Sequence, residues 1–188
     1  MTISQAERRA AIRVAHEPPW GKERVRHYLP DLVYGANDGI ITTFAVVSGV
    51  AGAALSPQTA IILGFANLLA DGFSMGASNF LSIRSDEAVN ELRGEPVQEP
   101  FPARHGFATL GAFVLAGSIP LIPFAVAPAA TRFPVAVFMT LAALFLIGAL
   151  RALVTRLHWV RAGSEMLLVG GVAAALSYGV GAFVAGLV

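Results

Sequence analysis

Residues 32–55 are LVYGANDGIITTFAVVSGVAGAAL, and residues 60–81 are AIILGFANLLADGFSMGASNFL. Each stretch is apolar over about the 20 residues that an α-helix needs to cross a hydrocarbon core roughly 30 Å thick. Only the sequence SPQT, at 56–59, separates them, which is too short for anything except a tight turn. The two stretches therefore predict an antiparallel hairpin of membrane-spanning helices.

Three more apolar runs of similar length follow in the second half of the chain. Together with the hairpin they predict an all-α integral membrane protein with five transmembrane helices per subunit. We expect a basic N-terminal segment at 1–30 and a transmembrane domain at 31–188, with a short acidic connector at 82–106. The predicted spans are 32–55, 60–81, 107–127, 133–150 and 166–188.

The composition excludes an ordinary soluble protein. Of the 188 residues, 55% are hydrophobic and only 13% are charged, whereas a typical soluble domain has about 25% charged residues. Residues 1–26 are too polar and too charged to contain the apolar core of a secretory signal peptide. Because the sequence contains no cysteine, disulfides, thiolate metal sites and thiol catalysis are excluded.

The basic residues predict how the chain is oriented in the membrane. Six of the 13 lysines and arginines precede the first span, and such residues favour the cytoplasmic side. With five spans, the basic residues of 82–106 and of 151–161 lie on that same side, and only Arg132 lies on the other. The N-terminus is therefore expected in the cytoplasm.

Each helix of the hairpin carries one aspartate inside the predicted membrane region, Asp38 and Asp71. An ionised carboxylate at the bilayer centre costs about 2.5 to 3.5 kcal/mol, so it needs a partner, a bound ion or water. The glycines that flank Asp38, Gly35 and Gly39, permit close approach of another helix. We interpret Asp38 as a cation ligand and proton acceptor; the alternative is a carboxylate hydrogen-bonded to a neighbouring helix.

The second helix of the hairpin has a regular polar stripe. Its members recur at every fourth residue and therefore share one slowly drifting helix face. Carboxylate and amide oxygens with one thioether form a plausible ligand set for Fe(II) or Mn(II), because sulfur does little for Mg(II) or Ca(II). Methionine also fills gaps between packed helices, which is the alternative for Met75. The stripe consists of Asn67, Asp71, Met75 and Asn79.

The short turn also predicts which residues lie at the same depth. If the hairpin is centred between residues 56 and 57, residues at equal depth have numbers that add up to about 113. Asp38 is then level with Met75, and Asp71 is level with Thr42.

Two glutamates beyond the second span, Glu87 and Glu91, share a face of its expected helical extension. They are candidates for a cytoplasmic metal-collecting patch, and a solvated helix end is the alternative. The four histidines show no ligand spacing, so we expect them at the surface or at the membrane interface. They are His16, His27, His105 and His158.

Motifs of soluble enzymes are missing from the sequence. It has no Gly-x-Ser-x-Gly, no phosphate-binding glycine loop, no His-Glu-x-x-His and no cysteine pair. We therefore expect neither catalysis nor a bound cofactor, and no nucleic-acid partner. The expected partners are a divalent metal ion, the lipid bilayer and a second copy of the chain.

The segments YGANDGIITTF at 34–44 and DGFSMGASN at 71–79 resemble the vacuolar iron transporter (VIT) family. The similarity extends to ALSYGVG at 175–181. The resemblance implies five membrane helices per subunit, a homodimer, and export of cytosolic Fe(II) or Mn(II) in exchange for protons. It also implies a pathway lined by an aspartate of the first helix and a methionine of the second, which match Asp38 and Met75.

Better-known members of that family carry a glutamate- and methionine-rich cytoplasmic domain between the second and third helices. Here only the residues 82–106 occupy this position, so the chain resembles a short member that lacks the large metal-binding domain. We expect Asp38, Met75, Asp71 and Asn79 to form the metal site, with Asp71 as a second ligand or as a proton relay.

The sequence thus predicts a proton-coupled exporter of Fe²⁺, Mn²⁺ or both that serves metal homeostasis. Two alternatives stay open: a membrane scaffold whose polar residues only join helices, and a transporter of another cation. The expected location is the plasma or inner membrane in a prokaryote and a vacuolar-type membrane in a eukaryote.

Overall fold

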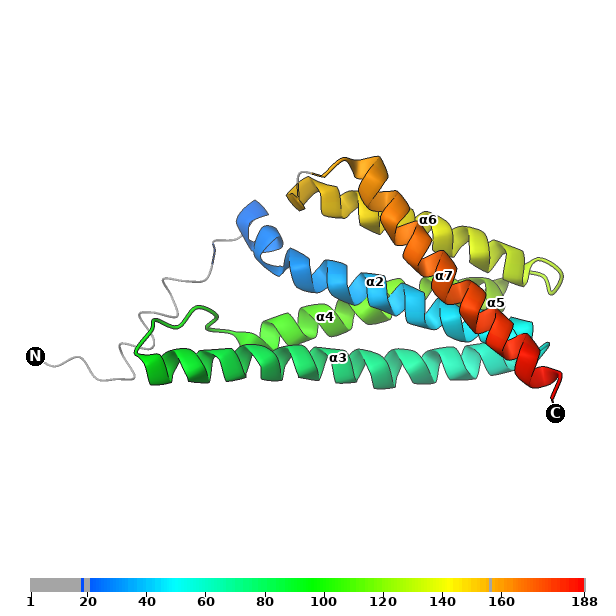
Figure 1. The fold of residues 1–188 in the computed structure, drawn as a ribbon, viewed down its shortest axis with the longest axis horizontal. Coiled ribbons are helices and arrows are strands. Elements are labelled where there is room, and N and C mark those ends of the chain that lie inside the picture. The colour runs from blue at the N-terminus through cyan, green and yellow to red at the C-terminus, as the bar shows by residue number, and fades with distance from the viewer. Residues whose placement is uncertain (1–17, 19–20, 156, 188) are drawn as a thin grey trace, which may run out of the picture.

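The computed structural model describes residue 18 and residues 21–155 and 157–187. The elements in this part of the chain are helices that run back and forth along one long axis (Figure 1). Most of the predicted N-terminal segment 1–30 lies outside the described residues. The elements are α2 (Lys22–Gly52), α3 (Pro57–Arg93), α4 (Pro102–Gly117), η1 (Ile119–Leu121), α5 (Ile122–Val126), α6 (Arg132–Thr155) and α7 (Trp159–Ala185).

The predicted hairpin is formed by α2 and α3, with a turn that lies nearer the N-terminus than expected. α2 ends at Gly52, and the turn includes Ala54, which has a φ of 52°. α3 then begins at Pro57, where a proline is tolerated because the first helical N–H has no partner within the helix. The side chain of Ser56 caps this end by accepting a hydrogen bond of 3.3 Å from the backbone N–H of Thr59.

The helix α3 continues to Arg93, well past the predicted end of its span at residue 81. The expected helical extension past the predicted span is therefore confirmed. Gly94 ends the helix in the left-handed conformation, with a φ of 73°. The irregular part of the connector is short and lies between this glycine and Phe101.

The third predicted span, 107–127, is built from three pieces. α4 begins at Pro102, earlier than predicted, and ends at Gly117. A short 3₁₀ helix, η1, then leads into α5, because Pro120 and Pro123 have no N–H to donate to the preceding turn.

Among the described residues, 4 helical stretches are long and apolar enough to cross a membrane. They correspond to α3, α4 with η1 and α5, α6 up to Ala152, and α7. The predicted first span is helical up to Gly52, as part of the 31-residue α2, but it is not among these four. Its sequence is more polar, since Asn37 and Asp38 interrupt the apolar run.

The helices alternate in direction. α2, α4 and α7 begin, and α3 and α6 end, at the same end of the molecule (Figure 1). Arg132 lies at the opposite end, at the start of α6. This arrangement is the one on which the charge-based orientation depends.

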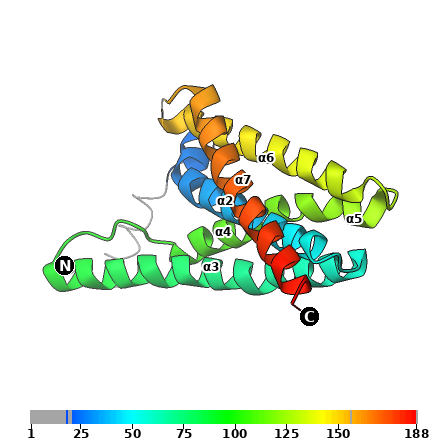
Figure 2. The ribbon, with the colours of Figure 1, turned by 45° about the vertical axis from the view of Figure 1, so that its right-hand side comes forward.

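The central helix is α2, which packs against α4, α7, α3 and α6 (Figure 2). A Cβ atom at Gly35 or Gly39 would collide with the backbone of α4, at Thr109 and Phe113 respectively. The predicted close approach of another helix to these two glycines is therefore confirmed, and the partner is α4. Near the other end of α2, Gly49 meets Gly181 of α7.

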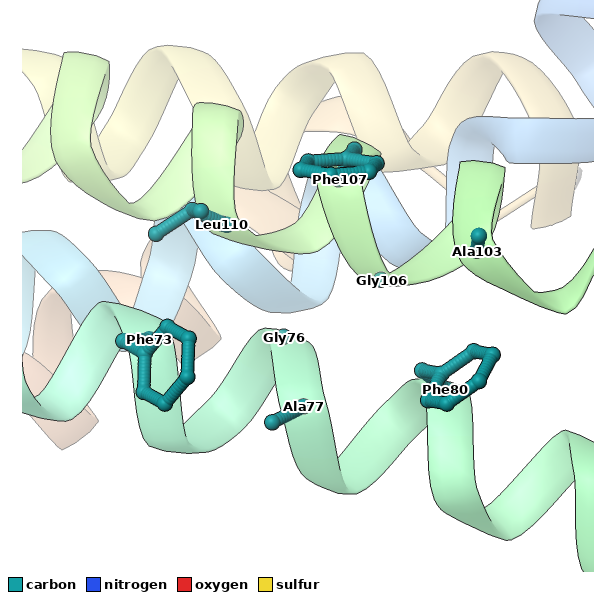
Figure 3. A pocket seen from close by; sticks show the side chains of 8 residues that line it. All are labelled: Phe73, Gly76, Ala77, Phe80, Ala103, Gly106, Phe107 and Leu110. Carbon is teal, nitrogen blue, oxygen red and sulfur yellow. The ribbon is translucent and has the colours of Figure 1, made fainter.

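An apolar groove of about 350 Å³ separates parts of α3 and α4. Figure 3 shows Phe73, Phe80 and Phe107 around it, and at its base Gly76 and Gly106 bring the two backbones together. The predicted metal ligands Asp38, Asp71, Met75 and Asn79 do not line this apolar groove.

Candidate metal centre

Two polar stripes, one on α2 and one on α3, face each other along the hairpin. Asn79 Nδ2 donates a hydrogen bond of 2.8 Å to Asp31 Oδ1. Twelve residues away along α3, Asn67 Nδ2 lies 3.5 Å from Thr42 Oγ1. All four side chains are half-buried. The stripes therefore form one polar column between the two helices. It consists of Asp31, Asp38 and Thr42 on α2 and of Asn67, Asp71, Met75 and Asn79 on α3.

These two contacts correct the predicted depths. The numbers of the paired residues add up to about 110, not 113, which displaces α3 by roughly one helical turn. Asp38 is consequently level with Asp71 instead of Met75. The two aspartates therefore share one depth on facing helices.

Polar neighbours surround Asp38. Thr42 Oγ1 donates to the backbone carbonyl of Asp38 at 2.8 Å. Asn37 Oδ1 is buried and has no hydrogen-bond partner among the described residues. Asp38 and Asp71 are both half-buried in the single chain, so their carboxylates can reach a ligand that approaches the column.

The side chain of Asn79 already joins three helices. Besides Asp31, its amide nitrogen donates 2.8 Å to Thr109 Oγ1 on α4. Both donor positions of the amide are thus used. The carbonyl oxygen Oδ1 is the atom with which Asn79 could bind a cation.

Met75 lies on the same stripe, one helical turn beyond Asp71. It is partly buried and packs against the apolar core that includes Leu68 and Phe113. The structure thus gives Met75 a packing role, and the thioether remains a predicted ligand.

The two connector glutamates differ in what they contact. Both oxygens of Glu87 accept hydrogen bonds from the backbone N–H of Gln98, at 3.0 and 3.1 Å. Oε1 also accepts one of 2.8 Å from Glu99. Glu87 therefore fixes the return of the connector along α3. Glu91 follows one turn later and is exposed, so its metal-collecting role remains a prediction.

His105 does not lie at the surface, which was one of the two places expected for the histidines. Only 5% of this residue is exposed. Its Nδ1 lies 2.6 Å from Asp31 Oδ2 and its Nε2 lies 3.1 Å from Glu99 Oε2. His27 Nε2 is also 3.1 Å from Glu99 Oε2. Sequence spacing missed this cluster, although His27 and Asp31 stand four residues apart on the helix of Asp38.

The described residues form a helical bundle in which 4 helices can cross a membrane and two aspartates share one depth, and these features are typical of a multi-pass membrane transporter. The model of the VIT family matches residues 29–95 and 88–182. The chain belongs to the VIT family, a family of membrane transporters.

Named relatives of the chain agree with this placement. Vacuolar iron transporter homolog 3 of Arabidopsis thaliana is 30% identical over 161 residues, which cover 81% of this chain and 80% of the relative. Vacuolar iron transporter 1 of the same plant is 26% identical over 206 residues, covering 79% and 82%. A vacuolar iron transporter of Plasmodium berghei is 46% identical over 57 residues, which span only 30% of this chain and 21% of that protein.

Proposed function

We propose that the chain is one subunit of a homodimeric transporter that exports Fe²⁺, Mn²⁺ or both from the cytosol in exchange for protons. The observation that supports it best is the polar column between α2 and α3, with Asp38 and Asp71 at one depth. Two carboxylates inside the apolar region are unfavourable unless something of positive charge lies between them. A divalent cation supplies this charge while metal is carried outward, and protons supply it while the empty site returns.

The proposed ligands are Asp38, Asp71, Met75 and the carbonyl oxygen of Asn79. Oxygen and thioether donors together suit a first-row divalent ion better than Mg²⁺ or Ca²⁺. Carboxylates bind a metal in their ionised form, so a proton on Asp38 or Asp71 opposes metal binding. This competition would couple outward metal movement to inward proton movement.

The exposure of the column supports a dimer. Asp38, Asp71 and Met75 are only half-buried in the single chain, which would leave polar groups facing lipid. A second copy placed over this face would cover them and contribute a matching set of ligands. In that arrangement α2 also crosses the membrane and brings the number of spans to five. Its polar residues are shielded from lipid by α3 and α4 on one side and by the partner on the other.

The names of the relatives support iron as cargo, because the three Arabidopsis and Plasmodium proteins above are all called vacuolar iron transporters or their homologs. The placement of basic residues supports a cytoplasmic N-terminus.

A vesicle assay tests the proposal. The purified chain is reconstituted with a pH gradient, and uptake of Fe²⁺ and Mn²⁺ is followed together with proton movement. We expect uptake that depends on the gradient and is lost in Asp38→Ala. Full uptake by Asp38→Ala would refute the proposed site. Competition with Zn²⁺ and Co²⁺ distinguishes this cargo from another cation.

A membrane scaffold is the second candidate, and the hydrogen bonds of Asn79 to α2 and α4 favour it. Interhelical bonds of this kind contribute about 0.6 to 2 kcal/mol each. Asp38→Asn distinguishes the two functions, because it keeps hydrogen bonding and removes charge. If the column only joins helices, the variant matches the wild type in both dimer stability and metal binding.

A further inference from the structure

A second group of metal-ligating side chains lies at the end of the polar column where α2 and α4 begin. His27 comes from α2, His105 from α4, and Glu99 from the connector between α3 and α4. One ligand atom of each lies within 4.8 Å of the other two. None of these residues belongs to the site between Asp38 and Asp71.

The distances suit a single ion. Glu99 Oε2 lies 3.1 Å from Nε2 of each histidine. First-row divalent metals bind nitrogen and oxygen ligands at about 2.0 to 2.2 Å, so ligand atoms around one ion are separated by roughly 3 to 4.4 Å. Small side-chain rotations therefore suffice for all three atoms to reach a common ion.

The surroundings of His105 hold its ring in the orientation that metal binding needs. Asp31 Oδ2 lies 2.6 Å from Nδ1 and favours the tautomer with a proton there. This tautomer leaves a lone pair on Nε2, which points to Glu99. Asp31 is itself held by Asn79, whose amide donates to its other oxygen. A carboxylate behind a ligating histidine is the usual arrangement in metal sites.

The position of Glu99 is also fixed by the fold. Its backbone N–H donates a hydrogen bond of 2.8 Å to Glu87. The connector is thereby tied to the extended end of α3, and the Glu99 side chain is directed between the two histidines.

We propose that His27, Glu99 and His105 form a second metal site for a first-row divalent ion such as Fe²⁺, Mn²⁺ or Co²⁺. Two imidazoles with one carboxylate select such ions over Mg²⁺ and Ca²⁺, which prefer oxygen ligands. Asp31 is a positioning residue of this site.

The site adjoins the polar column. Asp31 contacts both His105 and Asn79, and Asp38 follows Asp31 after about two helical turns, roughly 10 Å along α2. An ion released by the histidines would therefore enter the column directly. The metal site stands on its own geometry, and only its use in loading the column rests on the proposed function.

Pulsed electron paramagnetic resonance with Mn²⁺ tests the site in the purified full-length chain in detergent. Imidazole ligands give the bound ion a ¹⁴N coupling, whereas the proposed ligands of the column offer carboxylate, amide-oxygen and thioether donors. We expect ¹⁴N coupling in the wild type and in Asp38→Asn. His27→Gln and Glu99→Gln should each weaken binding of the nitrogen-coupled ion by about 10-fold or more, and Asp31→Asn by about 10- to 100-fold.

His158→Gln is the matched control, because this exposed histidine precedes α7 and makes no side-chain cap bond. It should leave the nitrogen-coupled ion unchanged. The proposal is overturned if the wild type shows no ¹⁴N coupling, or if His27→Gln binds Mn²⁺ as tightly as His158→Gln. Coupled Mn²⁺ in a chain that moves no metal in vesicles would refute the proposed function and leave this site intact.

Discussion

The pair α2–α3 and the pair α6–α7 cross the same molecule but differ in what they place inside the apolar region. α2 and α3 contribute two carboxylates and several amides and hydroxyls. Between residue 133 and Leu150, and again after Met166, α6 and α7 contain no ionised side chain. Their ionic contacts, Arg151–Glu165 and Arg161–Glu165, lie at the helix ends.

The comparison shows that unfavourable burial of polar side chains is concentrated in the pair α2–α3. If polar groups served only to join helices, both pairs would be expected to use them. Instead α6 and α7 associate through small residues and apolar contacts, such as Gly148 against Ala162 and Gly163 against Phe145. The polar groups of α2–α3 are therefore best explained by a requirement other than stability.

Removing one charge from the column should give the largest effect. We expect Asp71→Asn to lower metal uptake in vesicles by about 10- to 100-fold, as for loss of a metal-site carboxylate. Thr140→Val in α6 is the control, because the buried Thr140 hydroxyl has no hydrogen-bond partner in the part of the chain that the structure describes and the change should leave uptake within about 2-fold. Equal effects of the two variants would erase the distinction between the helix pairs.

The second test concerns the close packing that accompanies the column. Gly39→Val places a side chain against the backbone of Phe113, which should destabilise the fold by about 3 kcal/mol or more. Gly179→Val on α7 meets nothing within 4 Å and should be tolerated. Thermal unfolding in detergent measures both, and a tolerated Gly39→Val would contradict the observed α2–α4 contact.

The third test removes one of the links between the column and α4, the contact of Asp31 with His105. Asp31→Ala leaves His105 Nδ1 and the Asn79 amide without the partner they share, which should cost about 2 kcal/mol of stability. Asp31→Asn, which can still hydrogen-bond to His105, should recover part of this loss in the same unfolding measurement. No difference between Asp31→Ala and the wild type would show that the contact is dispensable.

The smallest effect is expected at the end of α6–α7. Glu165 accepts from Arg151 at 3.1 Å and Arg161 at 3.2 Å, but its side chain is 45% exposed. Glu165→Ala should therefore destabilise the chain by less than about 1 kcal/mol, and added salt should reduce the difference. A larger loss of stability would contradict the comparison, because α6–α7 would then depend on charged residues as much as α2–α3 does.

Much of the fold could be predicted from local pattern. The hydrophobic runs located the helices, and the fourfold spacing of Asn67, Asp71, Met75 and Asn79 located one polar face. The succession of apolar runs implied helices of alternating direction, which the described elements show, whereas the charge-based orientation stays a prediction. These features depend on residues near each other in the chain, so the sequence alone contains them.

The depth of α3 against α2 could not be predicted, because hydrophobicity does not mark where a helix ends. Ala53 and Leu55 are apolar and extend the first run, yet they belong to the turn. The turn is therefore centred near residue 54, and Asp38 meets the level of Asp71. A capping serine followed by proline, at 56 and 57, was the available signal for the earlier start of α3.

The histidine cluster was out of reach for a different reason. His105 and Asp31 are 74 residues apart. Their contact depends on how α4 slides along α2, and this position is set by Gly35 and Gly39 against the backbone of α4. Such a register emerges only from the packed structure.

The 37 residues of α3 extend about 55 Å, whereas the hydrocarbon core needs only about 30 Å. One part of this rigid helix therefore extends beyond the hydrocarbon core, while the part within the core carries Asp71. A tilt of the helix by about 10° would move the end of a 20 Å extension by roughly 3 Å. Since the chain contains no cysteine, a single cysteine in place of the exposed Leu92 would accept a spin label and report that motion as a distance between the two copies of the proposed dimer.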